Sequence, residues 1–175
     1  MKTVRSFTVA VLALGLAACD QEPLKSKSPG EPPPLTLGAQ AFVQVDNDLA
    51  KPGERVSVYV RVQLGTENQA KVGSYTGRLK FNPEALTWIS DQPINDGLRV
   101  TNPKGAETGD VRFAGASAGG FTDLALYHGV FEVRKAGYMD QLRTEMEELS
   151  AATSLGDLKP QLKLMPQIFL RTQAR

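Results

Sequence analysis

The feature that most constrains the fold is an alternation of side chains between residues 56 and 64. Apolar side chains recur at every second position: Val56, Val58, Val60, Val62 and Leu64. Successive side chains of a β-strand point to opposite faces of the sheet, so a period of two predicts a strand with one buried face. The chain must therefore supply a second layer that covers this face.

Shorter segments of the same kind surround this strand. We predict strands within residues 40–45, 75–81, 86–89, 97–100, 111–116 and 124–133. Turn-forming residues separate them, as in Asp46-Asn47-Asp48, Pro52-Gly53 and Asn82-Pro83. Short strands at this spacing predict an all-β fold, an antiparallel sandwich, rather than an α/β fold.

One segment, from Met139 to Leu149, fits two interpretations. Leu142, Met146 and Leu149 have the spacing of one helix face, whereas Leu142, Thr144 and Met146 alternate as in a strand. The local pattern slightly favours a helix.

The first 18 residues have the architecture of an export signal. Lys2 and Arg5 precede an apolar run from Phe7 to Leu16. This run is shorter than the roughly 20 residues that cross a bilayer core, so we expect a cleaved signal peptide. Leu16-Ala17-Ala18-Cys19 resembles the bacterial lipobox, which implies a protein exported and lipid-anchored to a membrane through acylated Cys19. The sequence does not determine which membrane or leaflet holds the anchor.

Composition restricts the partners of this chain. It has 20 Lys and Arg against 19 Asp and Glu, and removing Lys2 and Arg5 leaves 18 against 19. A nearly neutral chain with few aromatic residues gives no sign of nucleic-acid binding. Cys19 is the single cysteine and His128 the single histidine, so we expect neither an internal disulfide nor a metal centre, and no cofactor.

The chain divides into four predicted segments. A signal peptide (1–18) is followed by the lipidated cysteine and a proline-rich, disordered linker (19–38) that acts as a spacer. The sandwich is expected over 39–162, and 163–175 form a C-terminal strand or tail. Pro166 would restrict a closing strand there to a sheet edge.

Four pieces in order resemble the cohesin domain, a β-sandwich related to carbohydrate-binding modules. They are Val45 of the opening strand, Lys51-Pro52-Gly53-Glu54 leading into Val56-Ser57-Val58-Tyr59-Val60, then Leu79-Lys80-Phe81-Asn82-Pro83-Glu84-Ala85-Leu86, and Gly129-Val130-Phe131-Glu132-Val133. The resemblance implies a cohesin-like sandwich of the jelly-roll type over about residues 40–160. It also implies that residues 142–150 form the last core strand, which we prefer over a helix.

The resemblance also bears on the partner. In dockerin-binding cohesins an Asn and an Asp meet the partner, and these places correspond here to Ser74 and Thr76. The acidic contact is missing, so dockerin binding in the strict sense is not expected.

Residues 115–119 read Gly-Ala-Ser-Ala-Gly, which matches the G-x-S-x-G motif of esterases. Asp123 and His128 follow in the order of a hydrolase triad. A nucleophile elbow needs a strand that enters a helix, and Gly119-Gly120 cannot start one. We therefore predict no enzyme activity and interpret His128 as a polar side chain on an outward strand face. Asp46 and Asp48 lack the spacing of a calcium loop and predict a turn.

The best candidate for recognition is one outward sheet face. The alternation places on it Tyr59, Arg61, Ser74, Thr76, Arg78 and His128. An aromatic ring with guanidinium groups suits a protein surface or a sugar ring, although an ordinary solvated face fits equally well. Trp88 could stack on a sugar, but its place between Leu86 and Ile89 favours core packing.

These observations favour a non-catalytic, membrane-anchored module of the cell envelope that recognises a protein partner. A carbohydrate-binding module associated with polysaccharide binding or breakdown is the first alternative. A structural subunit of an envelope assembly is the second. The sequence does not separate the three.

Overall fold

The computed structural model describes residues 30–68, 70–94 and 96–171. The predicted signal peptide and Cys19 lie outside the described residues. Within them, no helix has the length and hydrophobicity that crossing a membrane requires.

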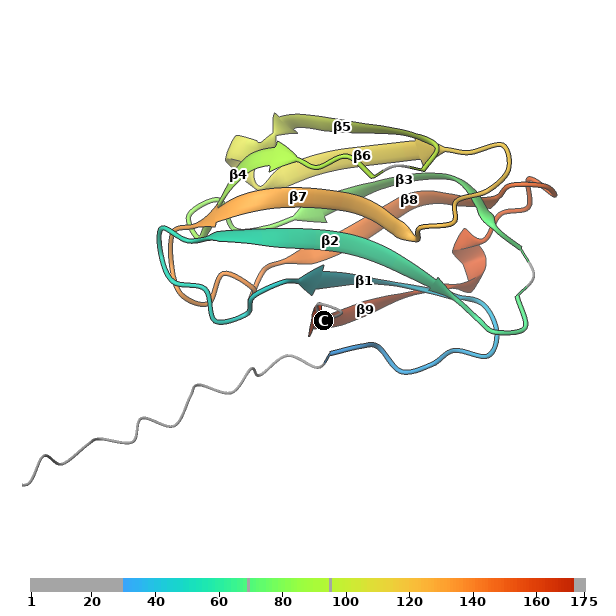
Figure 1. Ribbon diagram of the computed structural model, residues 1–175, viewed down its shortest axis with the longest axis horizontal. Helices are drawn as coiled ribbons and strands as arrows, with labels where there is room; N and C mark the ends of the chain where they lie inside the picture. The colour runs from blue at the N-terminus through green and yellow to red at the C-terminus, as the bar shows by residue number, and fades with distance from the viewer. Residues whose placement is uncertain (1–29, 69, 95, 172–175) are drawn as a thin grey trace, which may run out of the picture.

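Two packed sheets make up the described part of the chain (Figure 1). The strands are β1 (Ala39–Val45), β2 (Arg55–Leu64), β3 (Val72–Lys80), β4 (Leu86–Asp91), β5 (Leu98–Gly105), β6 (Asp110–Ala116), β7 (Ala125–Val133), β8 (Arg143–Ala151) and β9 (Leu162–Leu170). One sheet has the order β4-β7-β2-β1-β9 and the other β5-β6-β3-β8. Short 3₁₀ turns, η1 (Ala106–Thr108) and η2 (Lys159–Gln161), precede β6 and β9. The predicted all-β sandwich of two sheets is confirmed.

The alternation of β2 explains its central place in the first sheet. Val56, Val58 and Val60 are buried between the sheets, and the strand pairs antiparallel with β1 on one side and β7 on the other. The turn before it uses Gly53, whose φ of +89° is a conformation that other residues rarely adopt. Lys51 N–H donates to the Glu54 carboxylate at 2.8 Å, which closes this turn.

Aromatic rings fill much of the space between the sheets. Phe81 packs edge-on against Phe131, with ring centroids 5.1 Å apart, and Phe113 stacks on Tyr127 at 5.3 Å. The rings need room on the facing strands. A Cβ at Gly115 would lie 2.5 Å from the Tyr75 ring, so only glycine fits there.

Residues 143–151 form strand β8, so the preference for a strand is right and the helix that the local pattern favoured does not form. A β-bulge produces the misleading spacing, because Gly77 pairs with Met146 while Thr76 pairs with Glu148. The extra residue, Glu147, points outward, and Leu149 then returns to the core. Two inward side chains three positions apart therefore resemble a helix face.

The segment 163–170 belongs to the sandwich and is not a tail. Strand β9 pairs in parallel with β1 and forms the edge of its sheet. Ala41 pairs with Leu164 but Val43 with Ile168, so the extra residues around Pro166 bulge out of the ladder. This bulge accommodates a residue that has no N–H to donate.

The last part of the predicted linker does not act as a free spacer. Residues 30–38 run along the outside of the sheet that contains β1 (Figure 1). The Pro33 carbonyl accepts a hydrogen bond from Gln40 Nε2 at 2.8 Å, and the Leu35 carbonyl accepts one from Thr66 N–H at 3.0 Å. Gln40 is buried, and its amide needs such partners.

Candidate binding surfaces

The six residues predicted to share one face lie on two different sheets. Tyr59 and Arg61 are on β2 and His128 is on β7, whereas Ser74, Thr76 and Arg78 are on β3. The expectation of a single face is therefore wrong. Alternation identifies an outward side chain but not the sheet to which its strand belongs. We call the outward side of β4-β7-β2-β1-β9 the β2 face and that of β5-β6-β3-β8 the β3 face.

The β3 face has an apolar corner on its edge strand. Leu98 and Val100 of β5 are 69% and 57% exposed. Pairing places Leu98 beside Ala116 and Ser74, and Val100 beside Ala114 and Thr76. Small side chains thus surround two large exposed ones, which leaves the corner flat and accessible. Single exposed apolar residues are common, but adjacent ones mark a contact surface.

Sequence reasoning missed this corner because β5 inverts the usual pattern. Arg99 lies between the two apolar residues and points inward, where it donates to the Tyr75 hydroxyl at 2.8 Å. If apolar side chains are assumed to point inward, the inward and outward faces of β5 are assigned the wrong way round. The available signal was that Leu98 and Val100 are the only large apolar side chains of this short strand.

The other half of the β3 face is a network of ion pairs. Arg78 contacts Asp110 at 2.9 Å and Glu147 at 2.6 Å, and Arg112 reaches Glu147 at 2.9 Å. Hydrogen bonds from the two guanidinium groups lower the pKa of Glu147. Burial acts to raise the pKa of Asp110, but Lys80 and Arg78 outweigh it and the net shift is downward. Both carboxylates are charged at neutral pH.

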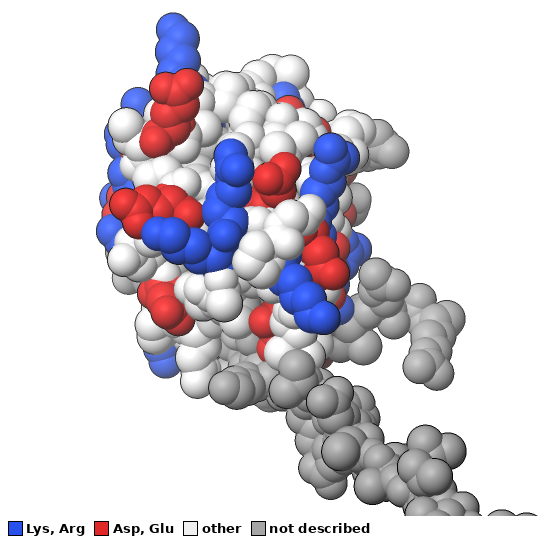
Figure 2. Space-filling view, turned by 90° about the vertical axis from the view of Figure 1, so that its left-hand side faces the viewer, with Lys and Arg blue, Asp and Glu red and all other residues white. Residues whose placement is uncertain are grey.

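Charges of both signs also alternate at one end of the molecule. Figure 2 looks at the end of the sandwich that lies on the left in Figure 1, and there Lys and Arg side chains are interspersed with Asp and Glu. This pattern agrees with the nearly balanced composition and favours short-range recognition over long-range attraction.

On the β2 face, Tyr59 is not an open platform. It is only 8% exposed. Its ring stacks on the His128 imidazole, with centroids 4.1 Å apart, and the Arg171 guanidinium lies 4.2 Å from the ring centroid. The idea that Tyr59 itself receives a sugar ring therefore fails, because its faces are already in contact with other side chains.

His128 sits in an environment that opposes its positive charge. Burial lowers its pKa, and the nearby Arg171 guanidinium lowers it further, against a smaller opposite effect of Asp46. Within the described part of the chain, buried Nε2 has no hydrogen-bond partner. A neutral, stacked imidazole at pH 7 follows from this setting.

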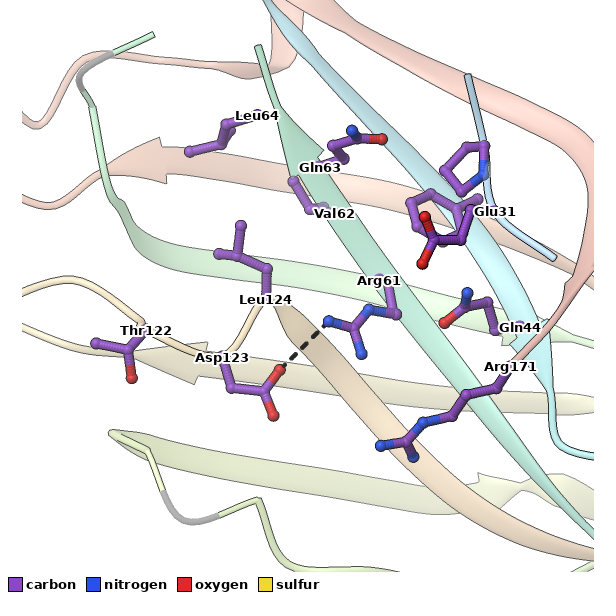
Figure 3. A pocket seen from close by; sticks show the side chains of 12 residues that line it. Glu31, Gln44, Arg61, Val62, Gln63, Leu64, Thr122, Asp123, Leu124 and Arg171 are labelled. Carbon is purple, nitrogen blue, oxygen red and sulfur yellow. Dashed lines mark ion pairs between the residues drawn. The ribbon is translucent and has the colours of Figure 1, made fainter. Parts of the chain in front are cut away.

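A polar cleft of about 740 Å³ opens on the β2 face beside this stack (Figure 3). Its floor comes from β1 and β2, and its far wall is the segment 122–124 that leads into β7. The polar lining consists of Glu31, Gln44, Arg61, Gln63, Thr122, Asp123 and Arg171. Arg61 and Asp123 form an ion pair across it at 3.7 Å.

A clamp at the end of the sandwich holds the far wall in place. Asp96 accepts backbone hydrogen bonds from Thr122 at 2.5 Å and Asp123 at 2.9 Å, which lower the pKa of Asp96. Arg99 donates to the carbonyls of Asp123 and Ala125 at 3.0 and 2.6 Å. Its guanidinium also lies 4.4 Å from the centroid of the Phe121 ring. A residue of β5 thus fixes a wall of the β2 face.

The remaining predicted residues have structural places. Trp88 packs against the core as expected, and its Nε1–H donates to the Tyr127 hydroxyl at 3.0 Å. Ser117 is followed by a turn that leads into β7, and no helix follows it as an elbow requires. The Asp46 carboxylate accepts from Ser57 N–H of the next strand at 2.9 Å, and Asn47 Oδ1 accepts from Leu49 N–H at 3.0 Å, which closes the predicted turn. Over the described ranges no cluster of three potential metal-ligating side chains occurs.

The fold and the surfaces define the class of protein to which this chain belongs. It is a two-sheet β-sandwich with largely polar outward faces and a last strand that pairs in parallel. Comparisons with known proteins narrow this class. No protein-family model matches the chain. A search of curated proteins finds no relative. Solved structures, however, match over most of its length.

The second type II cohesin module of the adaptor scaffoldin ScaA from Acetivibrio cellulolyticus is 11% identical, covering 79% of this chain and 98% of that one, with a TM-score of 0.55. The sixth cohesin of scaffoldin B from the same organism is 13% identical over 75% and 99%, with a TM-score of 0.55. A cohesin module from a family 33 glycoside hydrolase of Clostridium perfringens is 18% identical over 78% and 100%, with a TM-score of 0.55. The chain has the cohesin fold.

Proposed function

We propose that this chain is a non-catalytic binding module, exported and lipid-anchored at the cell envelope, that holds a protein partner on its β3 face. The observation that carries the proposal is the exposure of Leu98 and Val100 beside an ordered network of ion pairs. An apolar patch that adjoins charged and polar groups is a common composition of a protein interface.

The comparison supports a protein partner. The scaffoldin B cohesin, which shares the fold, was solved in complex with a dockerin. Ser74 and Thr76, which stand where dockerin-binding cohesins carry their contacting Asn and Asp, both lie on the β3 face. Neither is acidic, so a partner of this chain needs no cationic group there. We expect instead an apolar side chain over Thr76 and polar groups that meet Arg78 and Arg112.

The chemistry of the face predicts where the binding energy lies. Removing the apolar corner from water contributes about 25 cal/mol per Å² of buried surface. The ion pairs are exposed and already satisfied within the chain, so they add specificity more than affinity. Substitutions at Leu98 and Val100 should therefore weaken binding most.

A charge at the apolar corner tests the proposed face. We expect Val100→Asp to abolish recovery of the partner from the native envelope, because the carboxylate would be buried without a counter-charge. Leu155→Asp is the matched control, since Leu155 is 81% exposed in a loop outside the β3 face. Equal recovery by the wild type and Val100→Asp would exclude this face.

The membrane anchor is tested separately. We expect radiolabelled palmitate to enter the wild-type protein and not the Cys19→Ser variant, which would be released from the membrane fraction. Incorporation that does not depend on Cys19 would contradict the anchor and would leave the protein-binding proposal standing.

A further inference from the structure

The cleft on the β2 face has the form of a trough with two walls. Glu31 stands on one side, the segment 122–124 stands on the other, and Arg171 closes one end (Figure 3). Its volume of about 740 Å³ falls in the range of roughly 300–1,000 Å³ that small-molecule sites occupy. A second hollow of about 430 Å³ continues it toward His128 and shares Arg61 and Arg171.

The polar groups around the trough are of complementary kinds. Arg61 and Arg171 carry only donors, Glu31 and Asp123 carry only acceptors when ionised, and the amides of Gln44 and Gln63 offer both. A purely anionic ligand would meet the two carboxylates, and a purely cationic one would meet the two guanidinium groups. The lining suits a ligand whose groups donate and accept at once.

Among the residues that the structure describes, the two guanidinium groups keep most of their donors for a ligand. A guanidinium has five N–H donors. Arg61 makes one long ion pair, 3.7 Å from Asp123, and Arg171 contacts the Tyr59 ring through its flat face. Gln63 Oε1 accepts from Gln40, so the amide nitrogen of Gln63 is directed to other acceptors.

The position of the trough excludes binding of a peptide ligand as an added β-strand. Strands β1, β2 and β7 lie inside the sheet and are paired on both sides. An extended peptide therefore finds no strand edge there to which it could add. Recognition therefore has to come from side chains, and a ligand rich in hydroxyl groups, each of which both donates and accepts, suits this lining.

We propose that this trough is a saccharide-binding site, on the opposite face of the sandwich from the surface assigned to the protein partner. Arg61 and Arg171 donate to sugar oxygens, Asp123 and Glu31 accept from hydroxyls, and the apolar groups of Pro32 and Leu124 lie against the ring carbons. A module with two occupied faces joins a protein to a polysaccharide.

The trough is built before any ligand arrives, which favours binding. Asp96 and Arg99 hold the wall at residues 122–123, and the Tyr59 ring holds the Arg171 side chain. Fixing these groups in advance reduces the entropy that binding would otherwise cost.

A glycan array probed with the purified full-length protein tests the proposal, with neutral and uronate-containing oligosaccharides as separate arms. We expect retention on a subset of glycans, followed by calorimetry with the best of them. Arg61→Ala and Arg171→Ala should each weaken the affinity by about ten- to one-hundredfold, because each removes charge-assisted hydrogen bonds.

The matched control is Arg112→Ala, which removes an exposed arginine from the β3 face and should leave glycan affinity unchanged. Val100→Asp should abolish recovery of the protein partner and leave glycan binding unchanged. The proposals for the trough and for the β3 face can therefore be tested separately. No glycan retained above the level of the Arg61→Ala/Arg171→Ala double variant would overturn the proposal. Binding of acidic peptides with no glycan would also overturn it and assign the trough to a protein ligand.

Discussion

Both outward faces of this sandwich are built from strands with alternating side chains, but one face is exposed to solvent and the other is partly covered by the chain. The β3 face is open: its apolar corner and its ion pairs meet solvent. The β2 face is covered along β1, where Gln40, Phe42 and Gln44 point outward yet are buried. The outward face of a sheet is thus buried where other parts of the chain pack on it.

The difference follows from side-chain chemistry. The outward residues of β3, β6 and β8 include charged side chains that form ion pairs while they stay hydrated, so no covering is needed. The outward residues of β1 include Phe42, which packs edge-on against Phe169 at 5.3 Å. This aromatic pair needs cover, and the amides beside it need hydrogen-bond partners such as Pro33.

The largest expected effect on stability tests whether the covered part of the β2 face is packed as tightly as the core between the sheets. Phe169 is 1% exposed although it lies outside the space between the sheets. We expect Phe169→Ala to reduce the free energy of unfolding by about 3 kcal/mol, as for a core aromatic residue. Urea denaturation measures this. Val100→Ala on the open face should change it by less than about 0.5 kcal/mol, and equal effects would remove the distinction between the faces.

The next effect concerns the clamp that joins the two sheets. We expect Arg99→Ala to reduce the free energy of unfolding by about 2–3 kcal/mol, because it leaves the carbonyls of Asp123 and Ala125 without their donor. Amide hydrogen exchange should also accelerate at residues 122–124. Unchanged exchange there would show that Asp96 alone holds the wall.

A smaller effect concerns the ion pairs of the open face. The pKa of Glu147 is lowered by hydrogen bonds from Arg78 and Arg112, so its contribution to stability is present above its unfolded pKa and is lost as pH falls through the folded one. We expect the Arg78→Ala/Arg112→Ala double variant to raise the pKa of Glu147 toward its ordinary value. NMR titration of the Glu147 carboxyl carbon measures the shift, and an unchanged pKa in the double variant would contradict this explanation.

The smallest effect concerns His128 on the covered face. Burial and Arg171 lower its pKa, so the unfolded chain takes up a proton at higher pH than the folded one, and stability should fall as the pH drops below about 6.5. His128→Phe keeps a ring against Tyr59 and removes the titration. The free energy of unfolding of this variant should decline less between pH 7.5 and pH 5 than that of the wild type. An identical decline would place the titrating group elsewhere.

Much of the fold could be predicted because each strand carries its own alternation. Val56 to Leu64 identify β2 without any tertiary information, and Asn82-Pro83 correctly ends the preceding strand. The bulge at Glu147 shows the limit of this reasoning, because an extra residue in one strand is detectable only against its partner, β3.

The surfaces were less predictable, since they depend on which strands become neighbours. Ser74 and His128 are both outward and polar, but pairing sends them to opposite sides of the molecule. Arg171 could not be connected to Tyr59, because their contact depends on the parallel pairing of β9 with β1. Leu98 and Val100 were overlooked because the inward position between them is an arginine.

Site-specific photo-crosslinking in the native envelope tests the central claim most directly. A benzoylphenylalanine would replace Thr76 on the β3 face, and in a second variant it would replace Val130 on the β2 face. We predict a discrete protein adduct from position 76, lost when Val100→Asp is added, and no such adduct from position 130. A protein adduct from position 130 alone would contradict it.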